Sequence, residues 1–201
     1  MKKILLTIIA IMTMTTFISG QDIKLPEPQK NIGKPLMQAL SERKSSREFS
    51  DKDLSLQELS NLLWAANGFN RPDKRTAPTA LNKQELELYF CDKNGIYFYD
   101  AKNNVAKLIK KGDYRASAGH QEFVGTAAIN ILFVCDNSKS AKAEFSYTNC
   151  GYISQNIYLY CASEGLATVA RGSFDNDKLI KLLNLDSNFK VLLAQSVGYP
   201  K

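Results

Sequence analysis

The amino-acid sequence predicts an α+β protein, and three segments carry this prediction. Residues 127–136 are almost continuously apolar, which is typical of a strand buried on both faces. Residues 85–90 and 95–100 resemble two strands joined by an Asp-Lys-Asn-Gly turn, which predicts a β-hairpin. Residues 145–163 carry no charge, but their hydroxyl and carboxamide side chains are too polar for a membrane span. We therefore expect a helix buried against other protein there.

A second helix is predicted at residues 55–68 by both of its ends. Ser55 and Glu58 have the spacing of a capping box at the start of a helix. Gly68 is typical of a helix end. Between them, leucine and alanine side chains recur at helical spacing, which predicts one apolar face packed on the core.

The other segments carry shorter or mixed patterns. In chain order we expect a short helix at 36–43, a long polar loop at 69–84, a partly helical segment at 107–123, a strand at 166–170, a helix at 173–185 capped near Ser173 or Asp175, and a strand at 190–198. The uncharged helix at 145–163 offers more interior surface than one core needs. A subunit interface would cover that surface.

The first twenty residues have the layout of a secretory signal peptide. Two lysines precede an apolar run from Ile4 to Met12, and small or polar residues follow up to Gly20. We expect cleavage near Gly20, a Pro-containing linker at 21–34, one domain at 35–201, and a location outside the cytoplasm. The alternative is an uncleaved membrane anchor, although threonines interrupt the apolar run.

Composition and rare residues exclude several classes of protein. The chain is 44% hydrophobic and 23% charged, which is typical of a globular protein. Its net charge of +6 falls to +4 without the two leader lysines, and its basic residues are scattered, so nucleic-acid binding is disfavoured. The single histidine, His120, supports neither a histidine-based metal site nor a Ser-His-Asp triad. The four cysteines show no CxxC spacing, and we expect them to be buried free thiols.

A dense basic cluster lies at residues 43–50. Arg43, Lys44 and Arg47 surround the hydroxyls of Ser45 and Ser46. Guanidinium groups match the geometry of phosphate oxygens, and hydroxyls add short hydrogen bonds. The cluster therefore predicts an oxyanion site, whose ligand would neutralise the repulsion between the cations. The alternative is a solvated basic turn.

Four sequence elements in a fixed order give the chain a family resemblance. They are the basic cluster at 43–47, the segment Pro78-Thr79-x-x-Asn82 followed by Gln84, the helix-to-strand segment at 153–175, and the final Gly198-Tyr199-Pro200. Together they resemble the nitroreductase family of FMN-dependent oxidoreductases over residues 35–200. Segments 75–82, 95–100 and 169–175 look closer to the branch related to dehydrogenases that oxidise azoline rings in peptides.

The resemblance implies a fold and a cofactor site. The fold would be a central mixed or antiparallel sheet flanked by helices, with FMN at a homodimer interface. Ten positions would bind the cofactor: Arg43, Lys44, Ser45, Arg47, Pro78, Thr79, Asn82, Gln121, Arg171 and Gly172. Metal ligands and protein catalytic groups are not implied, because flavin N5 carries the chemistry.

Individual roles follow from the same resemblance. Arg43 and Arg47 would contact the phosphate and the pyrimidine edge, and Ser45 the ribityl chain or ring. Thr79 and Asn82 would reach the ring from the partner subunit. A backbone N–H of the loop formed by Arg171 and Gly172 would face flavin N5, where a donor stabilises reduced flavin. Gln121 would lie beside the ring.

Three features depart from the family pattern. Many relatives carry an acidic residue at the position of Arg171. Many carry basic residues beyond Gly-Tyr-Pro that complete the phosphate site, whereas this sequence ends at Lys201, which could substitute. Most relatives lie in the cytosol, where NAD(P)H is available, whereas the leader predicts export.

The expected activity is hydride exchange through FMN with a small organic substrate such as a nitroaromatic or a quinone. NAD(P)H or another reductant would complete a two-step cycle. Two alternatives stay open from the sequence. One is an exported flavin-binding protein without turnover, and the other is a dehydrogenase of modified peptides.

Overall fold

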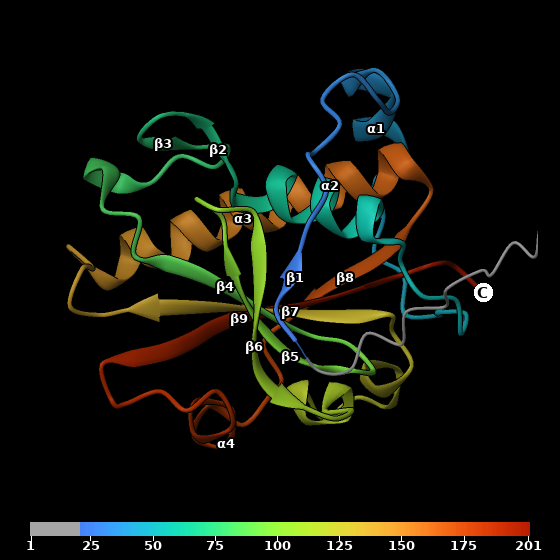
Figure 1. Ribbon diagram of the computed structural model, residues 1–201. Helices are drawn as coiled ribbons and strands as arrows, with labels where there is room; N and C mark the ends of the chain where they lie inside the picture. Colours follow the sequence, from blue (N-terminus) through green and yellow to red (C-terminus); the bar gives the residue numbers. More distant parts are fainter. Residues whose placement is uncertain (1–20) are drawn as a thin grey trace, which may run out of the picture.

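The computed structural model describes residues 21–201, and a twisted antiparallel sheet forms its centre (Figure 1). The strand order is β1-β6-β5-β4-β7-β9-β8, and all neighbouring pairs are antiparallel. The strands are β1 (Ile23–Lys24), β4 (Leu86–Cys91), β5 (Gly95–Asp100), β6 (Val105–Lys111), β7 (Ile129–Asp136), β8 (Ala167–Arg171) and β9 (Phe189–Gly198). The α+β prediction is confirmed, and the sheet is antiparallel rather than mixed.

Strand β7 lies in the interior of the sheet, between β4 and β9, and its sequence explains why. All eight of its residues are buried. It pairs with β4 on one side and β9 on the other, and Leu132 lies between Tyr89 and Ala194. A continuously apolar sequence suits a strand covered on both faces. The predicted strand and the predicted hairpin of β4 and β5 are thus both confirmed.

Helices cover both faces of the sheet. On one face lie α2 (Leu56–Asn67) and α3 (Ala143–Glu164), whose Leu62 and Ile153 pack with Phe90 and Phe133. On the other face lie α4 (Asn176–Leu182) and the short helices η2 (Arg115–Ala118) and η3 (Glu122–Gly125). Helix α1 (Leu36–Glu42) packs against α3. The core therefore has two layers, one on either side of β4, β7 and β9.

The helix ends follow local sequence rules. The Ser55 hydroxyl accepts from the Glu58 N–H at 3.2 Å, and the Glu58 carboxylate accepts from the Ser55 N–H at 2.8 Å, which confirms the capping box. Helix α3 ends at Gly165, whose φ of +74° favours glycine. Asp175, rather than Ser173, caps α4 by accepting from the Lys178 N–H.

Three segments differ from their predictions. Part of the expected linker at 21–34 is structured, because Ile23 and Leu25 are buried and β1 pairs with β6. The expected loop at 69–84 contains β2 (Phe69–Arg71), β3 (Lys74–Arg75) and the short helix η1 (Ala80–Asn82). The segment at 107–123 begins in the long strand β6 before η2 and η3.

The cysteine prediction is confirmed, whereas the leader prediction is not addressed. Cys91, Cys135, Cys150 and Cys161 are all free and buried. The predicted signal peptide at 1–20 lies outside the described residues. Within residues 21–201, none of the helices combines the length and the hydropathy needed to cross a membrane.

Candidate cofactor site

The basic segment at 43–50 is held in extended form along the end of the sheet. It leaves α1 at Arg43 and runs beside β8, where the Ser46 N–H donates to the Thr168 carbonyl at 2.9 Å. Further along, the Ser50 N–H donates to the Tyr199 carbonyl at 2.9 Å. Backbone hydrogen bonds to both β8 and the end of β9 therefore fix the cluster next to the edge of the sheet.

Tyr158 of α3 joins Arg43 and Ser45 to strand β8. The Arg43 guanidinium lies 5.3 Å from the centre of the Tyr158 ring. The Ser45 and Tyr158 hydroxyl oxygens are 2.8 Å apart. The Tyr158 hydroxyl also accepts from the Ala170 N–H at 2.9 Å. Tyr158 was not predicted, because nothing in an uncharged helix distinguishes a site tyrosine from a core tyrosine.

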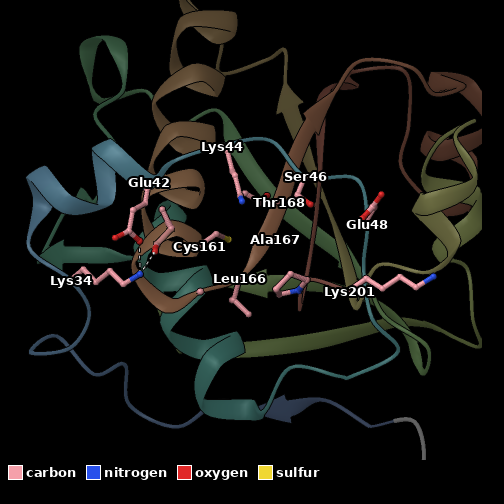
Figure 2. Close-up of a pocket in the computed structure, with 13 residues that line it drawn as sticks. Lys34, Glu42, Lys44, Ser46, Glu48, Cys161, Leu166, Ala167, Thr168 and Lys201 are labelled. Atoms are coloured by element: carbon pink, nitrogen blue, oxygen red, sulfur yellow. Dashed lines mark hydrogen bonds and ion pairs between the residues drawn. The ribbon is translucent and has the colours of Figure 1, made fainter.

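Every second side chain of the same segment, starting with Lys44, faces a separate cavity. Lys44 and Ser46 border a cavity of about 560 Å³ together with Thr168 and Lys201 (Figure 2). Because side chains alternate along an extended segment, Lys44 and Arg43 diverge. The structure thus separates Lys44 from the Arg43–Ser45 group with which it was predicted. An ion pair of 2.5 Å between Lys34 and Glu42 lies beside this cavity.

The cations of the cluster form no salt bridge with any residue of the described part of the chain. Within residues 21–201, no carboxylate forms a salt bridge with Arg43, Lys44 or Arg47. Arg47 and Ser45 are exposed, and Arg43 is half-buried. Unpaired guanidinium groups beside a hydroxyl are suitable donors for a phosphate. The donor set therefore fits the oxyanion end of FMN.

The turn after β8 presents its backbone rather than the Arg171 side chain. Arg171 is only 6% exposed, and its guanidinium points into the fold. Burial lowers the pKa of this guanidinium to about 10. Gly172 is exposed, and a Cβ placed on it would meet nothing within 4 Å. Of the two predicted positions, only Gly172 leaves an open approach for a ring.

Gln121 lies next to this turn. The His120 N–H donates to the Ser173 carbonyl at 3.3 Å, which ties the segment before η3 to the turn. The Gln121 Oε1 atom is buried and has no hydrogen-bond partner within residues 21–201. An unsatisfied buried carboxamide oxygen is unusual in a folded protein. A ligand donor could satisfy it, which suits the predicted place of Gln121 beside a flavin ring.

The remaining predicted residues lie at the other end of α3. Pro78, Thr79 and Asn82 belong to the η1 segment, which follows β3 and lies far from α1 (Figure 1). The Thr79 hydroxyl accepts from the Gln84 N–H at 3.2 Å, and the Asn82 side chain donates to the Asp73 carbonyl at 3.3 Å. One chain therefore does not bring these residues to Arg43, as expected if they serve the partner's site.

The described part of the chain shows neither a reactive thiol nor a cluster of metal ligands. Burial raises the pKa of Cys91 to about 12 and also raises the pKa values of Cys135, Cys150 and Cys161. These thiols are thus poor nucleophiles at neutral pH. Among residues 21–201, no three His, Cys, Asp or Glu side chains gather as metal ligands.

The antiparallel sheet, the helices on its two faces and the basic segment beside β8 define an α+β protein with a candidate site for an anionic cofactor. The chain belongs to the nitroreductase family, whose sequence profile matches residues 40–199. A candidate nitroreductase of Methanocaldococcus jannaschii is 26% identical over 183 residues, covering 82% of this chain and 90% of the relative. A solved candidate nitroreductase of Ralstonia eutropha is 36% identical, with a TM-score of 0.85 and coverage of 92% and 91% of the two chains.

Two more distant structures share the fold. A candidate nitroreductase of Desulfovibrio desulfuricans, solved with FMN, is 22% identical, with a TM-score of 0.62 and coverage of 83% and 87%. A chain of the Escherichia coli microcin synthetase complex is 16% identical, with a TM-score of 0.67 and coverage of 99% and 85%. The predicted family and fold are therefore confirmed.

Proposed function

We propose that the protein is an FMN-dependent oxidoreductase that exchanges hydride with a small organic substrate such as a nitroaromatic or a quinone. One observation carries the proposal. The hydrogen bond from Ser46 to Thr168 holds an unpaired cationic segment beside the strand that ends at the open Gly172 turn. A phosphate donor set and an exposed backbone turn thus share one end of the sheet. The FMN-bound relative supports the same cofactor.

Each part of the chain has a distinct task in this proposal. Arg43, Arg47 and Ser45 would hold the phosphate and ribityl end through charged and hydroxyl hydrogen bonds. The Gly172 backbone would lie against the ring without steric obstruction, and Gln121 would gain a partner for its Oε1 atom. Bound FMN would supply the hydride chemistry at N5.

We also propose a homodimer that completes each site. The outer surface of α3 exposes Phe145, Tyr147 and Tyr152, which are 39%, 52% and 45% exposed. Leu36 and Met37 of α1 and Leu81 of η1 are 62%, 76% and 77% exposed. Large exposed apolar side chains over neighbouring elements favour an interaction surface. A partner covering α3 would bring its η1 segment toward Arg43.

A spectroscopic experiment tests the activity. The purified protein is reconstituted with FMN, and the visible flavin absorbance is followed after addition of NADH, NADPH or dithionite under anaerobic conditions. Bleaching, followed by recovery on adding a nitroaromatic or quinone, is the expected result. A protein that binds FMN but never returns electrons to any acceptor would instead be a flavin-binding protein without turnover. Protein that takes up no FMN would reject the proposal.

The place of action is a separate proposal that rests on the leader alone. We propose that the mature chain begins near Gln21 and acts outside the cytoplasm, where it would use a reductant other than cytosolic NAD(P)H. N-terminal sequencing of the native protein tests this. An intact Met1 on cytoplasmic protein would reject it.

A further inference from the structure

Arg171 is a buried cation whose hydrogen-bond partners, among the residues that the structure describes, are all neutral. Its Nη1 atom donates to the Ala118 carbonyl at 2.6 Å, its Nη2 atom to Asn130 Oδ1 at 2.7 Å, and its Nε atom to Ser196 Oγ at 3.0 Å. Within residues 21–201, no carboxylate forms a salt bridge with it. A buried charge without a counter-ion is unfavourable for stability, and an apolar residue of similar volume is often better tolerated. Its presence therefore points to a role other than stability.

The three acceptors belong to three different parts of the fold. Ala118 ends η2, Asn130 lies in β7 and Ser196 lies in β9. The acceptors are themselves linked, because the Ser196 hydroxyl donates to Asn130 Oδ1 at 2.6 Å and Asn130 Nδ2 donates to the Val124 carbonyl at 2.8 Å. The guanidinium thus holds both ends of the 118–124 segment against the sheet, directly at Ala118 and through Asn130 at Val124.

The fit between Arg171 and this segment is tight. A Cβ placed on Gly119 would lie 2.2 Å from Arg171 Nη1 and 3.1 Å from the Ser173 carbonyl oxygen. Any side chain at position 119 would therefore push the segment away from the guanidinium. Glycine at this position lets the backbone pass between Arg171 and the turn at 172–173, and the His120 N–H reaches Ser173 from there.

We infer that Arg171 is a positioning residue, which clamps the 118–124 segment against the Gly172 turn and provides a fixed positive charge behind that turn. The effect on the cofactor rests on the proposed function, because it assumes that FMN lies against Gly172. The clamp would fix Gln121 beside the ring. The charge would favour the anionic reduced form of FMN over the neutral oxidised form.

Hydrogen exchange on the FMN-free protein tests the clamp. In Arg171→Met, which removes the charge and the donors, we expect the amides of residues 118–124 to exchange at least about tenfold faster than in the wild type. Gly119→Ala should open the same segment while keeping the charge. Unchanged exchange in both variants would overturn the clamp.

Arg75→Met is the matched control for hydrogen exchange. Arg75 of β3 also donates to neutral acceptors, the Asn67 carbonyl and Gln84 Oε1, each at 3.0 Å. Strand β3 and helix α4 lie on opposite sides of the sheet (Figure 1). Its variant should leave the exchange of residues 118–124 at the wild-type rate. Equal acceleration in the Arg75 and Arg171 variants would show general destabilisation and overturn the inference.

The reduction potential of bound FMN tests the charge. Arg171→Met should lower the preference for reduced over oxidised FMN by about tenfold, which corresponds to a two-electron potential about 30 mV more negative. Arg171→Lys keeps the charge and should restore most of this shift, although it lacks the guanidinium fork. An unchanged potential in Arg171→Met would overturn the charge effect. Wild-type protein that binds no FMN would instead reject the proposed function, while hydrogen exchange would still test the clamp.

Discussion

Single residues explain how the cluster of cations at 43–47 is tolerated. The chain is extended there, so the Arg43 and Lys44 side chains diverge to opposite sides of the backbone. Arg43 lies over the Tyr158 ring, whose face attracts a cation. Both features reduce the repulsion between the cationic side chains before any ligand binds. A phosphate near Arg43 and Arg47 would then add attraction to an arrangement that is already stable.

Arg43→Ala should weaken FMN binding without unfolding the protein. Charged hydrogen bonds to a phosphate contribute about 1.5–3 kcal/mol. Their loss corresponds to a dissociation constant about tenfold to hundredfold higher. Titration of FMN into the FMN-free protein at two salt concentrations measures this. Arg71→Ala is the control, since Arg71 is exposed in β2. Equal dissociation constants for the wild type and Arg43→Ala would contradict a phosphate role.

Among the elements, the segment at 21–34 acts as a strap across the helices. The Gln29 N–H donates to Asn61 Oδ1 at 2.8 Å, and the Lys34 N–H donates to the Ser163 hydroxyl at 2.7 Å. Before them, the Ser60 hydroxyl donates to the Pro26 carbonyl at 2.5 Å. Side chains of α2 and α3 thus satisfy the backbone of a segment that has almost no regular structure of its own.

Leu25→Ala should therefore destabilise the protein strongly. Leu25 is only 4% exposed, and truncating a buried leucine costs about 2–5 kcal/mol of unfolding free energy. Ile32→Ala in the same strap is the control, because Ile32 is 42% exposed and its loss should change stability by less than about 0.5 kcal/mol. Urea unfolding measures both. A freely moving linker would instead give the same small change for both variants.

The start of α2 is joined to the end of β9 through Glu58 and Tyr199. Burial acts to raise the pKa of the Glu58 carboxyl, but hydrogen bonds from the Tyr199 hydroxyl and from Ser55 outweigh burial and lower it below 4.5. A carboxyl whose pKa is lowered in the native state stabilises the fold at any pH above its ordinary, unfolded-state pKa. That stabilisation is lost as the pH falls through the pKa of the carboxyl in the native state.

Tyr199→Phe should consequently destabilise the protein at neutral pH and much less in acid. The variant removes one hydrogen bond that favours the ionised carboxylate, so the native pKa of Glu58 should rise toward 4.5. Urea unfolding at pH 7 and about pH 3 measures the difference between wild type and variant at each pH. Tyr152→Phe, at an exposed tyrosine, should show no such pH dependence. A Tyr199→Phe effect of equal size at both pH values would show that Glu58 is not the linked group.

The sequence predicts elements whose pattern is local, and it misses elements and contacts that depend on residues far away in the chain. Strand β7 and helices α2 and α3 were predicted because burial and capping leave a local pattern. The strand at 105–111 was missed because β1 pairs only with its first two residues, and Lys107 and Lys110 beyond them face solvent. Strand β1 has two residues and depends on β6 for its pairing. Tyr158 and the inward Arg171 escaped prediction for a similar reason, since their partners lie far away in the sequence.

At the scale of the whole molecule, the predicted cofactor-binding residues fall into two groups that lie apart in one chain. Arg43 contacts Tyr158 in the C-terminal half of α3, whereas the η1 segment, which carries Asn82, lies toward the N-terminal end of α3 (Figure 1). An isologous dimer across α3 would place the η1 segment of each chain near the Arg43 of the other. The exposed tyrosines of α3 and the apolar residues of α1 and η1 would then lie in the interface.

Tyr152→Arg should dissociate this dimer and reduce FMN binding together. Tyr152 is 45% exposed on α3, and a two-fold contact there would bury two unpaired guanidinium groups. Burying an unpaired charge costs several kcal/mol, so the dimer dissociation constant should rise at least about a hundredfold. Sedimentation equilibrium measures the assembly, and flavin fluorescence measures the cofactor. Ile109→Arg on β6, where Ile109 is 38% exposed, is the control and should change neither. A monomeric wild type that binds FMN tightly would show instead that one chain completes its own site, and Thr79 and Asn82 would then have no role in it.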